Sequence, residues 1–300
     1  MKIVLLGKKG MLGNQFPEKL QTAKARLGGG IEIFTFDHSE LDVTDSVKLR
    51  EVMMKISPDI VINCIAYTNV DLAETERKNS YLLNATVPTE LAKILSPLDA
   101  ILVHFSTDYV FDGQKPLFEG YKESDSTNPV NYYGETKLAG EKGIEANMKK
   151  YYIFRTSWLY GRRIENRGKN FVDTMLKLGR EVVEGKREKL AVVSDQFGCP
   201  TLTADLAQSV IDTIVMKYDS GSLPEFGIYH QSNDGVTNWN EFASEIFKIS
   251  EMDFNVEKIT TSDYPTPAKR PLNSILLNTK LPRLRAWDEA LREYLNSTPG

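Results

Sequence analysis

Short apolar runs alternate with longer, more polar runs over the first half of the chain. The short runs favour β structure and lie at Lys2–Leu6, Ile31–Phe36, Ile60–Cys64, Ala100–Phe105 and Tyr151–Arg155. Helix-like runs lie between them, such as Glu76–Leu95 and Tyr132–Asn147. Because the short runs are apolar almost throughout, they are typical of parallel strands that are buried on both faces. The alternation therefore predicts an α/β fold with a doubly wound parallel sheet.

The alternation weakens after residue 160. A further strand is predicted at Leu190–Ser194, and further helices at Ala204–Met216 and near Trp287–Leu295. A proline-rich turn, Tyr264–Pro271, precedes the last helix. We interpret residues 1–160 as a domain built on the sheet, with later crossings near 190–217, and residues 161–300 mainly as a smaller C-terminal lobe.

Composition narrows the class of protein. The chain is 41% hydrophobic and 26% charged, which is typical of a soluble globular protein. Its net charge of -4 disfavours nucleic-acid binding, which usually needs a basic face. No apolar stretch is long enough to span a bilayer, and the run Ile3–Leu6 is too short for a signal peptide. We therefore expect a cytoplasmic protein that binds neither nucleic acid nor membrane.

Cysteine and histidine give no sign of a metal site. Cys64 lies inside an apolar run, where a free buried thiol is expected, although the sequence leaves a disulfide with Cys199 open. The three histidines are scattered and have no metal-ligand spacing. We expect no bound metal.

A glycine-rich loop follows the first strand. Gly7, Gly10 and Gly13 form the spacing G-x-x-G-x-x-G between that strand and a helix-like run. Without Cβ atoms the chain can turn tightly, and its N–H groups and the helix N-terminus can approach a pyrophosphate. The loop therefore predicts a Rossmann-type site for a dinucleotide cofactor.

Residues after the second and third strands are candidates for the rest of the cofactor site. Asp37 follows the second strand, near the position where an acid meets the adenosine ribose in such folds. An acid there favours NADH over NADPH because it repels a 2′-phosphate, and a solvated loop acid is the alternative. Asp42 and Val43 are placed to flank the adenine. Small residues in the run Asn63–Ala66, which includes Cys64 and Ile65, would let the cofactor cross the sheet edge.

A tyrosine and a lysine open the helix-like run after the fourth strand. Tyr133 and Lys137 stand at i and i+4, on one helix face, whereas the adjacent Tyr132 has no lysine at that spacing. The pKa of an isolated phenol, about 10, is too high for efficient proton exchange at neutral pH. A nearby ammonium lowers it. Tyr133 could then protonate a carbonyl oxygen as hydride arrives, while Lys137 assists and holds the nicotinamide ribose.

Polar residues end the fourth strand. Thr107 and Asp108 come where parallel strands deliver side chains into a ligand crevice. The Thr107 hydroxyl could orient a substrate carbonyl and stabilise the growing alkoxide, although hydroxyl residues at strand ends are also ordinary caps.

Several separate strings of the chain, in order, resemble one family. They are Gly7–Gly13, Pro58–Thr68, Ser106–Gly113, Tyr133–Glu141, Arg155–Gly161, Asp195–Thr201 and Tyr264–Pro271. Together they resemble the extended short-chain dehydrogenase/reductases and, within these, the dTDP-4-dehydrorhamnose reductase family. The resemblance covers nearly the whole chain.

The resemblance implies a role for individual residues. It implies that Tyr133 is the proton donor, Lys137 its helper and Thr107 its hydroxyl partner. It places Thr107, Asp108 and Trp158 at the sugar. It also assigns cofactor contacts, to the phosphates from Gly10, Met11 and Leu12 and to the rest from Asp42, Val43, Ala66 and Phe105.

Two features concern the phosphates and a metal. Arg270 in the proline-rich turn is our candidate for the nucleotide diphosphate, because a guanidinium suits phosphate geometry, and a solvated basic turn is the alternative. Some family members are described as using magnesium, with a carboxylate early in the first helix. Here Asn14 and Gln15 occupy that region, so a role for magnesium is not expected.

The predicted reaction is reduction of the C4 ketone of dTDP-4-dehydro-β-L-rhamnose by NADH or NADPH, with Tyr133 as proton donor. One alternative is another nucleotide-sugar epimerase or reductase of the superfamily. A dehydratase is disfavoured, because Tyr109 stands after Asp108 where a second acid is needed. The other alternative is a non-catalytic regulatory subunit of methionine adenosyltransferase, against which Thr107, Tyr133 and Lys137 argue. The sequence leaves open whether the chain forms a homodimer.

Overall fold

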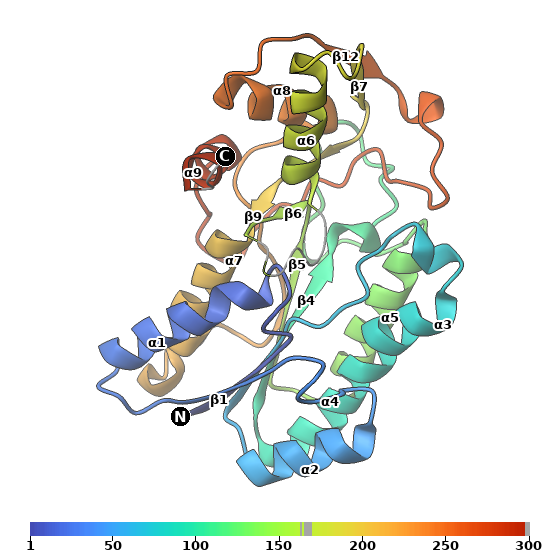
Figure 1. Cartoon of the computed structure of the whole chain (residues 1–300). Helices are drawn as coiled ribbons and strands as arrows, with labels where there is room; N and C mark the ends of the chain where they lie inside the picture. The colour runs from blue at the N-terminus through green and yellow to red at the C-terminus, as the bar shows by residue number, and fades with distance from the viewer. Residues whose placement is uncertain (163, 165–169, 298–300) are drawn as a thin grey trace.

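Six parallel strands form the central sheet of the computed structural model, which describes residues 1–162, 164 and 170–297 (Figure 1). The strand order is β10-β5-β4-β3-β1-β2, and every neighbouring pair is parallel. The strands are β1 (Lys2–Leu6), β2 (Glu32–Phe36), β3 (Ile60–Asn63), β4 (Ile101–Thr107), β5 (Tyr151–Thr156) and β10 (Gly227–His230). The chain order reverses between β1 and β3, so the predicted doubly wound parallel sheet is confirmed, with its ligand crevice expected at this point.

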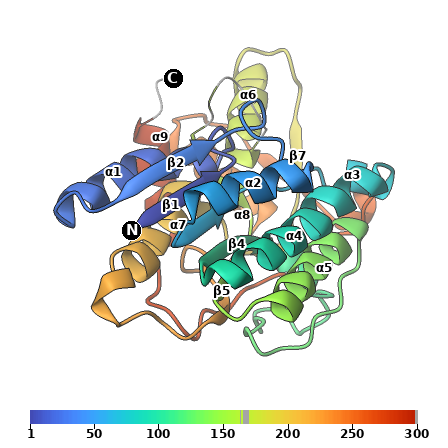
Figure 2. The ribbon, with the colours of Figure 1, turned by 90° about the horizontal axis from the view of Figure 1, so that it is seen from below.

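Helices cover both faces of the sheet (Figure 2). One face carries α1 (Phe16–Arg26) and α7 (Thr203–Val210), the latter continued by a π-helical turn, Ile211–Val215. The other face carries α2 (Ser46–Ile56), α4 (Val87–Leu95) and α5 (Tyr132–Asn147). A second π-helical turn, Leu82–Thr86, joins α3 (Arg77–Tyr81) to α4, so the predicted run Glu76–Leu95 is helical almost throughout.

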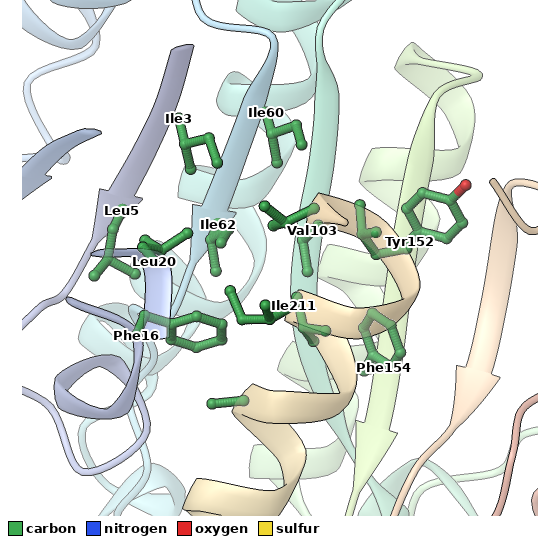
Figure 3. Packing of buried hydrophobic residues seen from close by; sticks show 14 of the residues in the cluster. Ile3, Leu5, Phe16, Leu20, Ile60, Ile62, Val103, Tyr152, Phe154 and Ile211 are labelled. Carbon is green, nitrogen blue, oxygen red and sulfur yellow. The ribbon is translucent and has the colours of Figure 1, made fainter. Parts of the chain in front are cut away.

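Apolar side chains from the strands and from α1 and α7 form the core on the first face. Figure 3 shows Phe16 and Leu20 of α1, with Ile211 after α7, over the buried strand residues Leu5, Ile62 and Val103. Each of these side chains is 2% exposed or less. Burial of this kind stabilises a protein by about 1.5–3 kcal/mol per large apolar side chain. The core therefore fixes the strand ends from which the site is built.

A smaller lobe lies beyond the carboxyl ends of the strands, at the top of Figure 1. Its helices are α6 (Phe171–Val183), α8 (Trp239–Ile249) and α9 (Trp287–Ser297). Its strands form three pairs, β7 (Leu190–Val193) with β12 (Val256–Ile259), β8 (Phe197–Gly198) with β11 (Thr237–Asn238), and β6 (Leu159–Tyr160) with β9 (Thr201–Leu202). Short 3-10 turns complete the described chain at Gly13–Gln15, Leu72–Glu74, Ser96–Leu98, Asp108–Val110, Tyr218–Ser220 and Thr261–Asp263.

The crossings after residue 160 differ in part from the prediction. The strand expected at Leu190–Ser194 is present as β7, but it pairs with β12 outside the central sheet. The sixth strand of the sheet is instead β10, which pairs with β5 and which the sequence pattern did not indicate. At four residues, two of them only partly buried, β10 is too short to give a recognisable apolar run. The lobe helices α6 and α8 were likewise not predicted.

Two properties can be stated for the described part of the chain. None of its helices is both long and apolar enough to cross a membrane. Its His, Cys, Asp and Glu side chains form no group of three or more that could hold a metal ion.

Candidate active site

The loop between β1 and α1 forms a close-packed cradle of backbone. Gly7 has a φ of +85°, and its N–H donates to the Phe36 carbonyl at 2.9 Å. A Cβ on Gly13 would lie 2.0 Å from the Gly7 carbonyl oxygen, so no other residue fits there. Among the described residues, the N–H groups of Met11 and Leu12 have no hydrogen-bond partner. Free N–H groups at the start of a helix fit a pyrophosphate, as the sequence predicts.

Two lysines of the loop contact the acids after β2. The Lys9 ammonium lies 2.9 Å from an oxygen of Asp37, and the Lys8 ammonium 2.6 Å from an oxygen of Glu40. The other Asp37 oxygen accepts from the N–H and hydroxyl of Ser39, at 2.8 and 2.6 Å. The hydrogen bonds from Ser39 and Lys9 lower the pKa of Asp37. Asp37 is therefore buried and paired rather than a solvated loop acid, and its charge is balanced.

The remaining predicted cofactor residues lie along the same sheet edge. Asp42 accepts from the Thr44 N–H and hydroxyl, which lower its pKa, and Val43 is buried in the core. Cys64, Ile65 and Ala66 are half-buried where β3 ends. A Cβ on Gly7 would meet the Ile65 side chain at 3.1 Å, so the structure brings these residues to the glycine loop. Burial raises the pKa of the free Cys64 thiol.

Tyr133 and Thr107 come together where β4 meets α5. Asn131 starts α5 by accepting from the Gly134 N–H at 2.8 Å, which places Tyr133 in the first turn, opposite the end of β4. The half-buried Tyr133 has its pKa raised by burial and lowered by a hydrogen bond with the Thr107 hydroxyl. The Tyr109 ring packs edge-on against the Tyr133 ring, with centroids 6.0 Å apart. A phenol and a hydroxyl in this arrangement can both donate hydrogen bonds to one carbonyl oxygen of a substrate.

Lys137 does not contact the phenol directly. Its ammonium donates to the Phe105 carbonyl at 2.6 Å and lies 3.4 Å from His104 Nε2. Burial lowers the pKa of Lys137 to about 8. The lysine extends along β4 to the Phe105 carbonyl, and its predicted lowering of the phenol pKa stays a prediction.

Phe105 contributes its backbone rather than its ring to this site. Its side chain packs in the core between Phe16 and Phe154, with ring centroids 6.1 and 6.0 Å away. Only the carbonyl oxygen meets Lys137. A cofactor contact from Phe105 would therefore involve its backbone.

Asp108 is a buried acid beside Thr107 and Tyr133. It is 2% exposed, and one of its oxygens accepts from the Thr107 hydroxyl at 2.9 Å. Its other oxygen, Oδ2, has no hydrogen-bond partner in the described chain. Burial raises the pKa of Asp108 to about 7, against the hydrogen bond from Thr107 and the nearby Ser274 hydroxyl, which lower it. Near neutral pH the carboxyl is therefore partly protonated and able to donate.

We predict that Asp108→Asn stabilises the protein at alkaline pH. The folded state holds this proton up to pH about 7 and the unfolded state loses it near 3.8, so the stability contribution falls as pH rises between these values. At pH 8, Asn should raise the free energy of unfolding by about 2–4 kcal/mol, an effect absent at pH 4. Urea unfolding at both pH values measures it. Asp42→Asn should act oppositely, because the pKa of Asp42 is lowered.

Trp158 lies in an aromatic stack at the base of the lobe. Its ring is parallel to that of Trp239, with centroids 3.5 Å apart and 7° between the planes. A Cβ on Gly198 would lie 2.6 Å from the Trp158 ring. Trp158 also has a φ of +48°, a left-handed conformation that is strained for a bulky residue. Strain held by such packing is found at many functional sites, and the position of Trp158 beside the sugar stays a prediction.

Arg270 connects the proline-rich turn to the loop after β3. Its guanidinium lies 2.9 Å from Asp71 Oδ2 and also donates to the Ala268 carbonyl at 2.8 Å. The other Asp71 oxygen accepts from the Ala268 N–H at 3.1 Å. The alternative of a solvated basic turn therefore does not hold for Arg270, since its side chain is only 15% exposed.

The magnesium region carries amides with their own partners. Asn14 donates to the Arg162 carbonyl at 2.8 Å, and Gln15 donates to the Asn14 side chain. Neither is a carboxylate, as the sequence already indicated.

Sequence reasoning missed several residues of the site. Trp239 is needed to stack on Trp158, and Asp71 to hold Arg270. His104 was passed over, although a histidine inside the wholly buried strand β4 is itself a signal, because buried polar groups need partners. Lys8 and Lys9 were read only as spacers of the glycine loop.

Comparison with known proteins places this site in a family. The model of the family described as the RmlD substrate binding domain matches residues 1–299. The dTDP-4-dehydrorhamnose reductase of Shigella flexneri is 38% identical over 313 aligned residues, covering 99% of this chain and 97% of that protein.

Two solved structures are similar over the whole fold. The dTDP-4-dehydrorhamnose reductase of Clostridium acetobutylicum has a TM-score of 0.86 at 38% identity, covering 99% of each chain. That of Bacillus anthracis, in complex with NADP, has a TM-score of 0.87 at 37% identity, also covering 99% of each chain.

Proposed function

The chain belongs to the RmlD substrate binding domain family, and from that membership we propose that it reduces the C4 ketone of dTDP-4-dehydro-β-L-rhamnose to dTDP-L-rhamnose. Sequence identity of 38% to a dTDP-4-dehydrorhamnose reductase over 99% of the chain supports this substrate. The observation that carries the proposal is the placement of the Tyr133 phenol beside the Thr107 hydroxyl at the carboxyl end of β4. An acid and a positioned hydroxyl are what a ketone reductase needs at the carbonyl oxygen.

The chain's own groups act on the carbonyl oxygen. A nicotinamide cofactor on the glycine loop supplies the hydride. Thr107 donates a hydrogen bond that orients the ketone, and Tyr133 gives its proton to the same oxygen as negative charge develops there. Lys137 lies one helical turn from Tyr133, and burial lowers its pKa to about 8. At this pKa the lysine can supply a proton to the site near neutral pH. Orientation of this kind can lower a reaction barrier by about 7–11 kcal/mol.

We propose that the site accepts both NADH and NADPH. Asp37 by itself would repel a 2′-phosphate, but its carboxylate is paired with Lys9, and Glu40 is paired with Lys8. A 2′-phosphate entering here would meet two ammonium groups as well as two carboxylates. The charges at this end of the site therefore allow NADPH to bind as well as NADH.

We predict that Lys9→Met weakens NADPH binding more than NADH binding. Without the ammonium, the buried Asp37 charge is unbalanced and repels the 2′-phosphate that only NADPH carries. The KM ratio of NADPH to NADH should rise about tenfold, which corresponds to roughly 1.4 kcal/mol. Steady-state kinetics with each cofactor measure it. Lys24→Met, in the last turn of α1, is the control, and an unchanged ratio in Lys9→Met would rule out the balancing role.

We place the nucleotide sugar between the sheet edge and the smaller lobe. Asp108 and Thr107 face it from β4, and Trp158 bounds it from the lobe. Arg270 is our candidate for the diphosphate, because an arginine can bind phosphate in bidentate fashion. These groups come from both halves of the chain, so we assign residues 1–160, with the later crossings, to the cofactor and the lobe mainly to the sugar nucleotide. Because the nucleotide sugar and the nicotinamide cofactor are both small molecules of the cytoplasm, we assign the protein to that compartment.

Arg270→Gln is expected to raise the KM for the nucleotide sugar about tenfold or more, with little change in the KM for NADH. The substitution removes a charged hydrogen bond to phosphate, worth roughly 1.5–3 kcal/mol. Lys269→Gln is a matched control, since Lys269 is the adjacent cation and is exposed. Equal effects of the two changes would mean that the turn acts only through its positive charge and that Arg270 makes no specific contact with the diphosphate.

The proposed function is tested by mixing the protein with NADH or NADPH and enzymatically prepared dTDP-4-dehydro-L-rhamnose. Loss of nicotinamide absorbance that depends on the sugar is the expected result. A protein that binds the cofactor but gives no turnover with either form would refute the reductase and direct attention to the regulatory role. If the protein converts other nucleotide sugars but not dTDP-4-dehydro-L-rhamnose, it is an epimerase or a reductase that acts on a different substrate.

A further inference from the structure

Three buried polar side chains form a line beneath the predicted site. Asn63 ends β3, His104 stands beside it in register on β4, and Lys137 covers them from α5. Their exposed fractions are 1%, 0% and 2%. Asn63 Nδ2 lies 3.2 Å from His104 Nδ1, and His104 Nε2 lies 3.4 Å from Lys137 Nζ. Nothing in the proposed reaction yet uses Asn63 or His104.

The backbone fixes which way the Asn63 amide points. The N–H of Ile65 lies 3.1 Å from one end of the amide, and a backbone N–H can only donate, so that end is the oxygen. The NH₂ end therefore faces His104 Nδ1 and donates to it. Burial and the charge of Lys137 hold the pKa of His104 well below its usual value, so the imidazole is neutral. A neutral ring that accepts at Nδ1 carries its single proton on Nε2.

The proton on Nε2 consequently points at Lys137 Nζ. An N–H can hydrogen-bond to Nζ only when the lysine is a neutral amine with a free lone pair, and it opposes the ammonium form. The other groups around Lys137 are the Phe105 carbonyl, which either form of the lysine can donate to, and Tyr133 and Glu141 on its own helix. Glu141 favours the ammonium, but it is paired at 2.7 Å with Arg155 from β5.

We propose that Asn63 and His104 are positioning residues that hold a proton on His104 Nε2 against Lys137, and so keep this lysine in ready exchange between ammonium and amine. The proposal rests on the proposed reduction. After Tyr133 has protonated the substrate oxygen, an N–H bond of the ammonium breaks, and the proton passes through a bridging hydroxyl group or water molecule to the phenolate, where the phenol O–H bond forms again. The resulting amine accepts a hydrogen bond from Nε2–H, and solvent later returns its proton.

The proposed reaction requires that Lys137 release a proton near neutral pH and that its neutral amine form keep a hydrogen-bond partner. A lysine with the ordinary pKa of about 10.4 gives up its proton poorly at neutral pH. A purely apolar wall would make the lysine less basic but would leave the amine without a partner. The imidazole supplies that partner and adds no charge.

The tautomer of His104 is the first test, and it does not depend on turnover. Selective ¹⁵N labelling of histidine gives spectra of only three residues, His38, His104 and His230. His104→Gln assigns the signal. We expect His104 to stay neutral between about pH 5 and 9, with Nε2 protonated and Nδ1 bare. A proton on Nδ1, or an imidazolium in this range, would overturn the proposal even if the protein is a reductase.

The second test switches the tautomer with a near-isosteric change. In Asn63→Asp the carboxylate still accepts from Ile65 and now also accepts from His104, so the ring proton should move to Nδ1 and leave Nε2 to accept from the ammonium. The pKa of Lys137, read from ¹³Cε-labelled lysine, should rise by about one to two pH units, and the alkaline limb of kcat should rise with it.

The outcomes separate the proposal from its rivals. A raised lysine pKa without a change of tautomer would mean that the added charge acts alone, and a change of tautomer without a raised pKa would mean that His104 does not act on Lys137. Either result contradicts the proposal.

Discussion

Tyr133→Phe is expected to lower kcat by about 10²–10⁴-fold, the range typical of losing a positioned general acid. The phenol is the group that hydrogen-bonds with Thr107, and phenylalanine keeps the ring that packs against Tyr109 while removing only the hydroxyl. The free energy of unfolding and the affinity for NADH should therefore change little. Steady-state kinetics measure kcat, NADH titration by fluorescence measures the affinity, and urea unfolding measures the free energy of unfolding.

The neighbouring tyrosine provides the matched control. Tyr132 lies on the same turn of α5, and its ring packs under the Arg77 guanidinium at 3.9 Å rather than in the site. Tyr132→Phe should leave kcat within about twofold, since a phenylalanine face also attracts a cation. Equal losses in the two variants would show that Tyr133 matters for the helix start and not as an acid.

Arg155→Leu is expected to destabilise the fold by about 3–5 kcal/mol, because it leaves a buried carboxylate without its charge partner. Arg155 on β5 and Glu141 on α5 have side chains only 4% and 1% exposed. Their nitrogen and oxygen atoms meet at 2.7, 3.0 and 3.2 Å, and Glu141 also accepts from the Ser106 hydroxyl. Urea unfolding followed by circular dichroism measures the loss.

Two further variants show whether burial is the cause. Lys93 and Glu90 on α4 make an ion pair of the same 2.7 Å length at the surface, with side chains 46% and 29% exposed. Lys93→Met should cost less than about 1 kcal/mol. Changing both Arg155 and Glu141 to leucine should recover part of the loss, because no charge is then buried alone. A double variant less stable than the sum of the two single changes would contradict this explanation.

The parts of the fold that were predictable are those governed by local pattern. The buried strands read as apolar runs, and α5 begins at Tyr132, as predicted, because Asn131 caps it directly. The glycine loop was recognisable because only glycine satisfies both the turn at Gly7 and the contact at Gly13. In each case the physical cause lies within a few consecutive residues.

The parts that were missed depend on contacts between distant segments. Strand β10 has four residues and is defined by pairing with β5, while β7 is drawn away from the sheet by β12. The contacts of Lys137 with His104 and with the Phe105 carbonyl come from β4, more than thirty positions earlier. The ring of Trp158 stacks on that of Trp239, some eighty positions later in the chain, so the stack was not predictable from the residues around Trp158. Periodicity carries no information about such pairings.

The central claim, reduction of the sugar ketone at C4, is tested most directly with a labelled cofactor. The protein is incubated with nicotinamide cofactor that carries deuterium at both hydrogen positions on C4 of the reduced ring, together with dTDP-4-dehydro-L-rhamnose, and the product is analysed by NMR. We predict dTDP-L-rhamnose with deuterium at C4 of the sugar, formed by the wild type and nearly lost in Tyr133→Phe. A sugar product without deuterium at C4, or deuterium at another carbon, would contradict the assignment of this reaction.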